Sequence, residues 1–214
     1  MKKQKIILSW DIYVITNEEL AFGRSNVDIT RAALEGGAKI IQLRDKHSSS
    51  RKFYEDALQI RKLTRATNTT FIVNDRLDIA LAADADGLHV GQNDLPASIA
   101  RKYLGKSKIL GISAINFEQS IEAAKQGADY LGVGPIFEAR KTKPDADPPI
   151  GLDNLKVISD ALDIPIVAIG GINIKNARDI IDAGANSVAV ISAIVSTPNI
   201  SNSTYEFIQA IKNE

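Results

Sequence analysis

Two aspartates follow two neighbouring apolar runs of the sequence at similar positions. Asp75 comes shortly after the run Phe71–Val73, and Asp94 comes shortly after the run Gly87–Val90. A helical pattern separates the runs, so both would be parallel strands whose carboxyl ends meet at one edge of a sheet. Two carboxylates that point into one pocket repel each other unless a cation lies between them. Because all the ligands would be oxygens, we predict that Asp75 and Asp94 bind Mg²⁺, which usually keeps waters and substrate phosphates as its other ligands.

A simpler interpretation exists for each aspartate on its own. Asp75 would cap the helix that follows it. Asp94 would lie in a turn ahead of Pro96. We favour the metal site because it explains why both carboxylates stand at equivalent strand ends.

An amide and two cations lie at alternating positions at the end of another predicted strand. Side chains alternate along an extended chain, so Gln42, Arg44 and Lys46 would share one face. Arg is suited to bidentate contacts with a phosphate, and Lys adds a point charge. We therefore predict an anion-binding group at this strand end. The alternative is a solvated loop in which Asp45 neutralises its neighbours.

Three further segments have features of phosphate binding. Gly170-Gly171 and Ile191-Ser192 end the last two predicted strands, a place where barrels often hold a phosphate beside a short extra helix. Residues 193–196 could form that helical turn. We predict that the long polar segment 136–150 is a lid over a bound anion. The alternative is an exposed insertion of mixed charge.

Composition excludes several classes of protein and site. The chain has 214 residues, 44% of them hydrophobic, and its 26 basic and 26 acidic residues give zero net charge. We expect no nucleic-acid or membrane partner from this balance, and no run is long enough to span a membrane. The lack of Cys excludes disulfides and thiolate chemistry. The apolar run in MKKQKIIL is too short for a signal peptide, so we expect a cytoplasmic enzyme, which is compatible with a homo-oligomer.

Apolar strands and amphipathic helices alternate along the whole chain. The predicted strands are 12–16, 39–44, 70–74, 86–90, 108–113, 129–134, 165–170 and 187–192. The predicted helices are 27–34, 51–66, 77–83, 97–104, 117–125, 152–162, 177–183 and 204–212. His89, within a predicted strand, and His47, in a loop, are interpreted as core or surface residues and not as catalytic ones.

A recurring phrase in GGAKIIQL, QGADYLGV and AGANSVAV marks a helix end followed by a buried parallel strand. We predict a single (β/α)8 TIM barrel over residues 1–214, with its chemistry at the carboxyl ends of the strands. A doubly wound open sheet is the rival fold, but no G-x-G-x-x-G follows the first strand.

With these segments in place, the sequence resembles the thiamine phosphate synthase family along almost all of its length. The resembling motifs begin with YVIT at 13–16, QLRDK at 42–46, NDR at 74–76 and ADGLHVGQNDLP at 85–96. They continue with GADYLGVGPIF at 127–137, TKPDA at 142–146, AIGGI at 168–172 and VAVIS at 188–192. The resemblance implies a barrel that joins a pyrimidine methyl diphosphate to a thiazole phosphate, carboxylated in some members, and releases pyrophosphate.

The resemblance also implies a role for each candidate residue. Asp75 and Asp94 would bind Mg²⁺, Ser113 would lie beside the reacting methylene, and Gln42 beside the pyrimidine. The residues implied to hold the diphosphate are Arg44, Lys46, Asn74 and Lys143. The residues implied to receive the thiazole phosphate are Thr142, Gly171, Ile191 and Ser192. Arg44, Lys46, Ser113 and Lys143 would then be the catalytic group, with no nucleophile required.

The predicted lid departs from the family pattern. The family usually shows P-T-x-T-K after G-P-I-F, whereas residues 138–143 read EARKTK here. The first Thr is replaced and the loop is one residue longer, so Arg140 or Lys141 would have to supply its contact with the thiazole phosphate. Two alternatives therefore stay open, a related barrel that isomerises the thiazole and a non-catalytic phosphate-binding barrel. The intact NDR, GQND and TK motifs favour the synthase.

Overall fold

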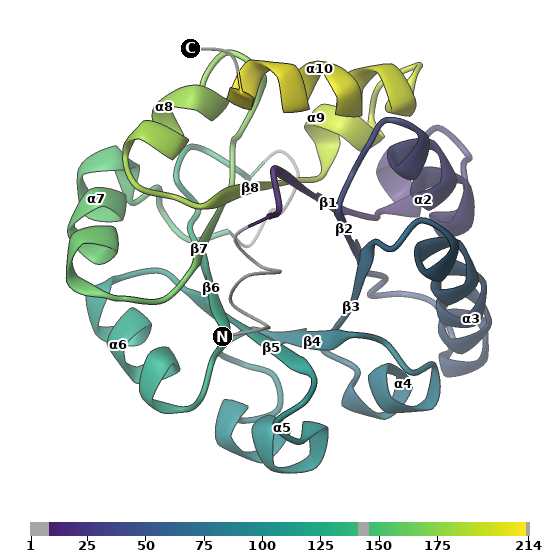
Figure 1. Ribbon diagram of the computed structural model, residues 1–214, viewed down its shortest axis with the longest axis horizontal. Helices are drawn as coiled ribbons and strands as arrows, with labels where there is room; N and C mark the ends of the chain where they lie inside the picture. The colour runs from purple at the N-terminus through teal and green to yellow at the C-terminus, as the bar shows by residue number, and fades with distance from the viewer. Residues whose placement is uncertain (1–8, 141–145, 213–214) are drawn as a thin grey trace.

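Eight parallel strands form a closed barrel in sequence order, and helices surround it (Figure 1). The computed structural model describes residues 9–140 and 146–212. The strands are β1 Ile12–Ile15, β2 Ile40–Leu43, β3 Thr70–Asn74, β4 Gly87–Val90, β5 Ile109–Ala114, β6 Tyr130–Val133, β7 Ile166–Ile169 and β8 Ser187–Val190. The helices are η1 Glu18–Leu20, α2 Asn26–Glu35, α3 Ser50–Ala66, α4 Leu77–Ala82, α5 Ala97–Leu104, α6 Phe117–Lys125, α7 Gly151–Ala161, α8 Ala177–Asp182, α9 Ser192–Val195 and α10 Ile200–Lys212. The predicted (β/α)8 barrel is confirmed.

Differences from the predicted elements are confined to their ends and to two short helices. The helix α10 begins at Ile200, earlier than the predicted 204, because the side chain of Asn199 accepts a hydrogen bond from the backbone N–H of Asn202 at 3.0 Å. The short helix η1 was not predicted. The extra turn expected at 193–196 is present as α9, displaced by one residue.

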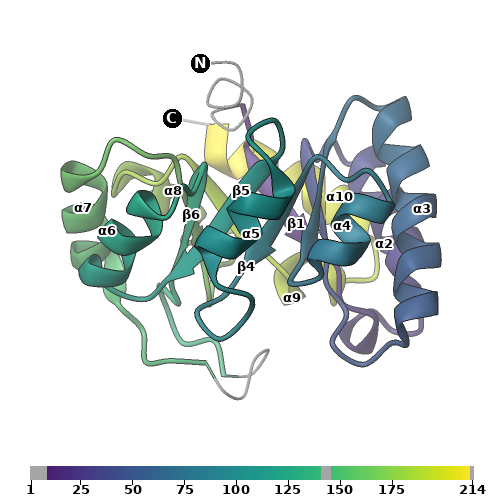
Figure 2. The same cartoon turned by 90° about the horizontal axis from the view of Figure 1, so that it is seen from below.

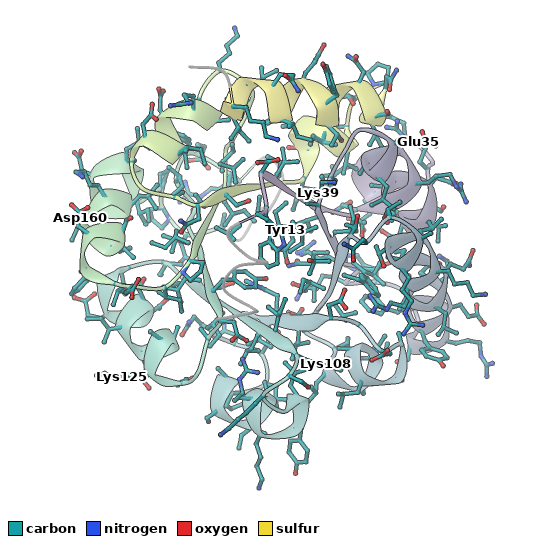
Figure 3. All side chains as sticks on the ribbon, viewed as in Figure 1. Tyr13, Glu35, Lys39, Lys108, Lys125 and Asp160 are labelled. Atoms are coloured by element: carbon teal, nitrogen blue, oxygen red, sulfur yellow. The ribbon has the colours of Figure 1, made fainter. Side chains whose placement is uncertain are left out.

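Alternation along the strands creates two apolar layers. On β1, Tyr13 and Ile15 belong to the cluster inside the barrel, whereas Ile12 and Val14 belong to the larger cluster that the helices cover. Figure 3 places Tyr13 near the middle of the barrel. Every inward position is thus two residues from the next along a strand, which determines the residues that reach the carboxyl-terminal end.

The register brings the predicted site residues to that end. Gln42 lies beside Ile15 and Ile72 on the neighbouring strands, and Asn74 lies beside His89. The short helix α9 and the connection that leaves β6 lie on the same side of the barrel (Figure 2). Within the described residues, no helix has the length and hydropathy needed to cross a membrane.

Candidate active site

The ends of β2, β3 and β4 bring one cation and two carboxylates together. Lys46 forms an ion pair with Asp75, and the carboxyl groups of Asp75 and Asp94 lie within hydrogen-bonding reach of each other. The side chain of Lys46 is 45% exposed and that of Asp75 is 19% exposed. The cluster is therefore open to a ligand from the carboxyl-terminal side of the barrel.

The backbone directs both carboxylates toward this point. Asp75 has a left-handed φ of 59°, and its N–H donates to the carbonyl oxygen of His89 at 2.8 Å. The cap residue of α4 is Arg76, and no side chain caps that helix. The alternative in which Asp75 caps α4 is therefore wrong. Asp94 does lie in a turn, since its Oδ2 accepts from the Gly91 N–H at 2.8 Å, but its carboxyl group also reaches Asp75.

The two carboxyl groups titrate as a pair. Burial raises the pKa of Asp75, and the nearby Asp94 adds to this effect while Lys46 opposes it. Burial also acts to raise the pKa of Asp94, but hydrogen bonds from Asp75 and from the Gly91 N–H lower it overall. In the protein without a metal, Asp75 therefore holds a proton more readily than Asp94 does. A divalent cation between them would take the place of that proton.

The donor set fits Mg²⁺ better than a cation that needs a full protein cage. The described residues contain no group of three or more His, Cys, Asp or Glu side chains arranged to hold a metal. Mg²⁺ is commonly bound by one or two carboxylates together with waters and substrate phosphates. Asp75 and Asp94 can supply that pair, and Lys46 lies beside them to balance phosphate charge.

In the loop after β2, the adjacent charged residues Asp45 and Lys46 have different partners. Asp45 accepts hydrogen bonds from the N–H groups of His47 and Ser48, both at 2.9 Å, and Lys46 pairs with Asp75 instead. The alternative in which Asp45 neutralises Lys46 is therefore wrong. Arg44 makes no ion pair with any described residue and is half-buried, so its guanidinium is available to an anion.

Gln42 and Ser113 lie on the inward faces of β2 and β5. The Nε2 of buried Gln42 donates to the hydroxyl of Tyr13 at 2.7 Å. The Oγ of Ser113 lies 2.9 Å from Nε2 of His89. His89 was expected to be a core or surface residue, and its contact with Ser113 was missed. Alternation along β4 and β5 was the available signal, because both residues fall on inward positions.

The other predicted phosphate segment lies at the ends of β7 and β8. Gly170 and Gly171 have positive φ values of 99° and 66°. A Cβ on Gly170 would lie 2.4 Å from the Cβ of Pro135, so the start of the β6–α7 connection packs against this pair. Ser192 begins α9 directly after Ile191. Close packing accounts for both glycines, and their phosphate contact stays a prediction.

The middle of the predicted lid lies outside the described residues, and so do Thr142 and Lys143. The described ends of the segment are tied together, since the N–H groups of Ile150 and Gly151 donate to the carbonyl oxygens of Pro135 and Ile136 at 2.8 and 3.1 Å. Arg140 forms an exposed ion pair with Glu138 at 3.5 Å.

Comparison with known proteins decides the family. A family profile described as thiamine monophosphate synthase matches residues 12–194. The chain is 52% identical over 194 residues to a thiamine-phosphate synthase of Chloroflexus aurantiacus, covering 91% of this chain and 89% of the relative. It is 53% identical over 191 residues to one of Moorella thermoacetica, covering 89% and 90%. The chain belongs to the thiamine monophosphate synthase family.

A solved structure agrees with this assignment. Thiamine phosphate pyrophosphorylase from Pyrococcus furiosus superposes with a TM-score of 0.88 at 38% identity, covering 99% of this chain and 98% of that one. The protein is therefore a transferase of this family. The names of these relatives favour the synthase over the isomerase and non-catalytic alternatives.

Proposed function

We propose that the protein joins an aminopyrimidine methyl diphosphate to a hydroxyethylthiazole phosphate, with or without a carboxylate on the thiazole, and releases pyrophosphate in a Mg²⁺-assisted dissociative reaction. The observation that carries this proposal is the group formed by Lys46, Asp75 and Asp94. One cation beside two carboxyl groups that lie within hydrogen-bonding reach of each other is a suitable receptor for a metal-bound diphosphate.

Each side chain has a distinct task in this proposal. Lys46 and Arg44 bind the diphosphate and stabilise the negative charge that grows on it as the bond to the pyrimidine methylene breaks. Gln42 binds the pyrimidine edge and Ser113 lies beside the methylene. The electron-rich pyrimidine stabilises the resulting carbocation, so no protein nucleophile is needed.

Asp75 and Asp94 would hold Mg²⁺, which when bound would supply charge neutralisation for the leaving diphosphate. Asn74 and Lys143 would bind the same diphosphate. The thiazole phosphate would be received by the segments Gly171 and Ile191-Ser192 together with Thr142. Holding this phosphate fixed brings the thiazole nitrogen to the methylene, and such positioning can lower the barrier by several kcal/mol, about 7 or more in favourable cases.

The proposal is tested with purified protein, both substrates and Mg²⁺, following thiamine phosphate and pyrophosphate by chromatography. We expect product only when all three are present, and loss of product when Mg²⁺ is removed with a chelator. Asp75→Asn should abolish most turnover. Asp78→Asn is a matched control, because Asp78 lies on the same segment and its side chain is 65% exposed.

The outcomes separate the candidate activities. Product formed equally well in the chelator would refute the magnesium site while leaving the synthase. No product from well-folded protein at millimolar thiazole phosphate would refute the synthase itself. Isomerisation of the thiazole phosphate without joining would instead establish the isomerase.

A further inference from the structure

A chain of hydrogen bonds crosses the barrel interior and connects the two residues predicted to face the pyrimidine. It starts at Gln42, whose Nε2 donates to Tyr13 OH at 2.7 Å. The hydroxyls of Tyr13 and Tyr130 lie 2.9 Å apart. Tyr130 OH lies 2.9 Å from Nδ1 of His89, whose Nε2 lies 2.9 Å from Ser113 Oγ. Five side chains from five strands thus form one continuous path.

The barrel is built to accommodate this path. A Cβ on Gly111 would lie 2.1 Å from Cζ of Tyr130 and 2.5 Å from Nδ1 of His89. A Cβ on Gly132 would lie 2.8 Å from Cε1 of His89. The two glycines on β5 and β6 therefore leave room for the His89 and Tyr130 rings, and any larger residue would displace them.

The ring of Trp10 covers the two tyrosines of the path on one side. Trp10 packs edge-on against Tyr13 and Tyr130, with ring centroids 5.8 and 5.4 Å away. Its own Nε1 donates to Thr70 Oγ1 at 3.2 Å and so does not compete for the two hydroxyls. Tyr13 and Tyr130 are 1% and 0% exposed. Their partners must therefore come from within the path, and each proton in it has to be assigned consistently.

Counting donors and acceptors gives the path a direction. Tyr13 accepts from Gln42, so its own proton goes to the oxygen of Tyr130, and the proton of Tyr130 goes to Nδ1 of His89. The imidazole then carries its proton on Nε2 and donates to Ser113 Oγ. The Ser113 hydroxyl proton is left for the pocket, as are the Gln42 carbonyl oxygen and its second amide hydrogen.

The reverse direction is self-consistent only if the Gln42 amide is turned over. The Ser113 proton would then go to His89, and Gln42 would accept from Tyr13 and present its two N–H groups and the second lone pair of its oxygen to the pocket. Both arrangements need neutral rings, and burial favours these forms because it raises the pKa values of both tyrosines and lowers the pKa of His89 to about 4. The contact that selects the first arrangement is the one from Nε2 of Gln42 to the Tyr13 hydroxyl.

We propose that His89 is a positioning residue that, through Tyr130 and Tyr13, fixes Gln42 as an acceptor and Ser113 as a donor, so that the pocket selects an aminopyrimidine over its oxo analogue. An amide binds an amino group and the adjacent ring nitrogen as a bidentate pair. The oxo analogue presents an acceptor and an N–H in those places. Binding it would require the amide to turn and the whole path to reverse.

The proposal rests on the proposed function for the identity of the ligand, but the direction of the path is measurable without it. The chain has two histidines, so protein labelled with ¹⁵N-histidine gives two ring systems, and His47→Gln assigns them. At pH 7 we expect His89 to carry its proton on Nε2. A ring protonated on Nδ1, or an even mixture of the two tautomers, would overturn the proposal whatever the enzyme's activity.

A second experiment measures selectivity. The ratio of kcat/KM for the aminopyrimidine diphosphate to that for its oxo analogue is compared in wild type and Tyr130→Phe, which keeps the ring but removes the hydroxyl. We expect the ratio to fall by roughly tenfold, because the break in the path leaves the Gln42 amide free to turn and accept the oxo analogue. Tyr103→Phe is the control, since Tyr103 is 62% exposed on α5.

A purely structural role would lower both kcat/KM values together and leave their ratio unchanged, which would also overturn the proposal. Tyr13→Phe breaks the path at a second point and should reduce the ratio in the same way. If wild type makes no thiamine phosphate, the proposed function fails, while the tautomer of His89 still decides the direction of the path.

Discussion

At the amino-terminal rim of the barrel, Asp86 accepts from Arg61 at 2.8 and 3.0 Å and from the N–H of Phe71 at 2.8 Å. Asp129 likewise pairs with Arg101 and accepts from a backbone N–H. At the carboxyl-terminal rim, Asp75 and Asp94 face each other instead, and Lys46 forms an ion pair with Asp75. Aspartates at the amino-terminal rim each pair with an arginine, whereas the two at the carboxyl-terminal rim lie against each other beside one lysine.

The supporting contacts at the amino-terminal rim recur along the chain. The carboxylate or amide before β4, β6 and β8 is Asp86, Asp129 or Asn186, and each accepts from a backbone N–H of the preceding strand. Asp129 and Asn186 occupy the same position of the repeated phrase, in QGADYLGV and AGANSVAV, and Asp86 makes the equivalent contact from outside that phrase. The residues at the opposite ends of the strands differ from unit to unit, as expected where the active site of a barrel enzyme takes a different residue from each strand.

The largest expected effect comes from changing one aspartate at each rim in the same way. Asp94→Asn should lower turnover by about a hundredfold or more, since it removes a charge that stabilises the transition state. Its Tm should stay the same or rise, because two like charges no longer face each other. Asp86→Asn should lower the Tm and leave the turnover of folded protein within about twofold of wild type. Thermal unfolding and steady-state assays measure both.

The opposite pattern of turnover and stability would contradict the proposed difference between the two rims. A large loss of stability in Asp94→Asn would show that the carboxyl-terminal pair is structural. A loss of turnover in folded Asp86→Asn would show that the amino-terminal rim contributes to the reaction.

The next largest effect is on stability at the amino-terminal rim. Arg101 donates to the carbonyl oxygens of Gly105, Lys108 and Gly127 and forms an ion pair with Asp129. Arg101→Met should cost about 3–4 kcal/mol of unfolding free energy, because it leaves a half-buried carboxylate and several carbonyl groups without a partner. Urea unfolding checks this value.

The matched control for this change is Arg31→Met, since Arg31 forms only an exposed pair with Asp28. It should change the unfolding free energy by less than about 1 kcal/mol. Equal losses in the two variants would show that the Arg101 contacts add nothing to stability.

Between the two rims, the lowered pKa of buried His89 predicts that the stability of the protein depends on pH. Its folded pKa of about 4 lies below the ordinary value of 6.5, so the unfolded chain takes up a proton first as the pH falls. Stability in metal-free protein is therefore complete above pH 6.5 and decreases toward pH 4, by at most about 2–3 kcal/mol. Tm values of wild type across this range, compared with His89→Gln, measure the difference.

His47→Gln is the control for this measurement, because His47 is exposed and, among the residues that the structure describes, its ring pairs with Glu19 alone. Its curve should follow wild type. If His89→Gln follows wild type as well, the barrel interior does not hold His89 neutral.

The sequence predicted the barrel and the Asp75–Asp94 pair because both depend on local signals. Helix ends, apolar runs and the rule that successive parallel strands are neighbours are enough to bring those two carboxylates together. The path through Tyr13, Tyr130 and His89 was missed because its hydroxyl contact joins residues 117 positions apart. Finding it requires the inward register of several strands at once. The alternative role of Asp45, neutralising its neighbours, could be ruled out only from the structure, because it depends on a turn that directs its oxygens to the loop backbone.

The smallest expected effect is at the other side of the carboxyl-terminal rim, where an arginine supports the short helix α9 of the predicted thiazole phosphate site. Arg24, in the connection between β1 and α2, donates to the carbonyl oxygens of Val195 and Thr197, both at 2.8 Å, and of Ala21 at 2.7 Å. These bonds fix the end of α9 and the turn after it. Arg24→Met would let the helix shift without removing any group that contacts the ligand.

Such a change should raise the KM for thiazole phosphate by roughly fivefold to tenfold, equivalent to about 1 kcal/mol, and leave kcat nearly unchanged. An anchor that binds the ground state and the transition state equally well affects KM alone, whereas the diphosphate side should affect kcat. Arg31→Met again serves as the control. A fall in kcat without a change in KM would place α9 with the leaving-group machinery, and the two sides of this rim would then no longer have separate tasks.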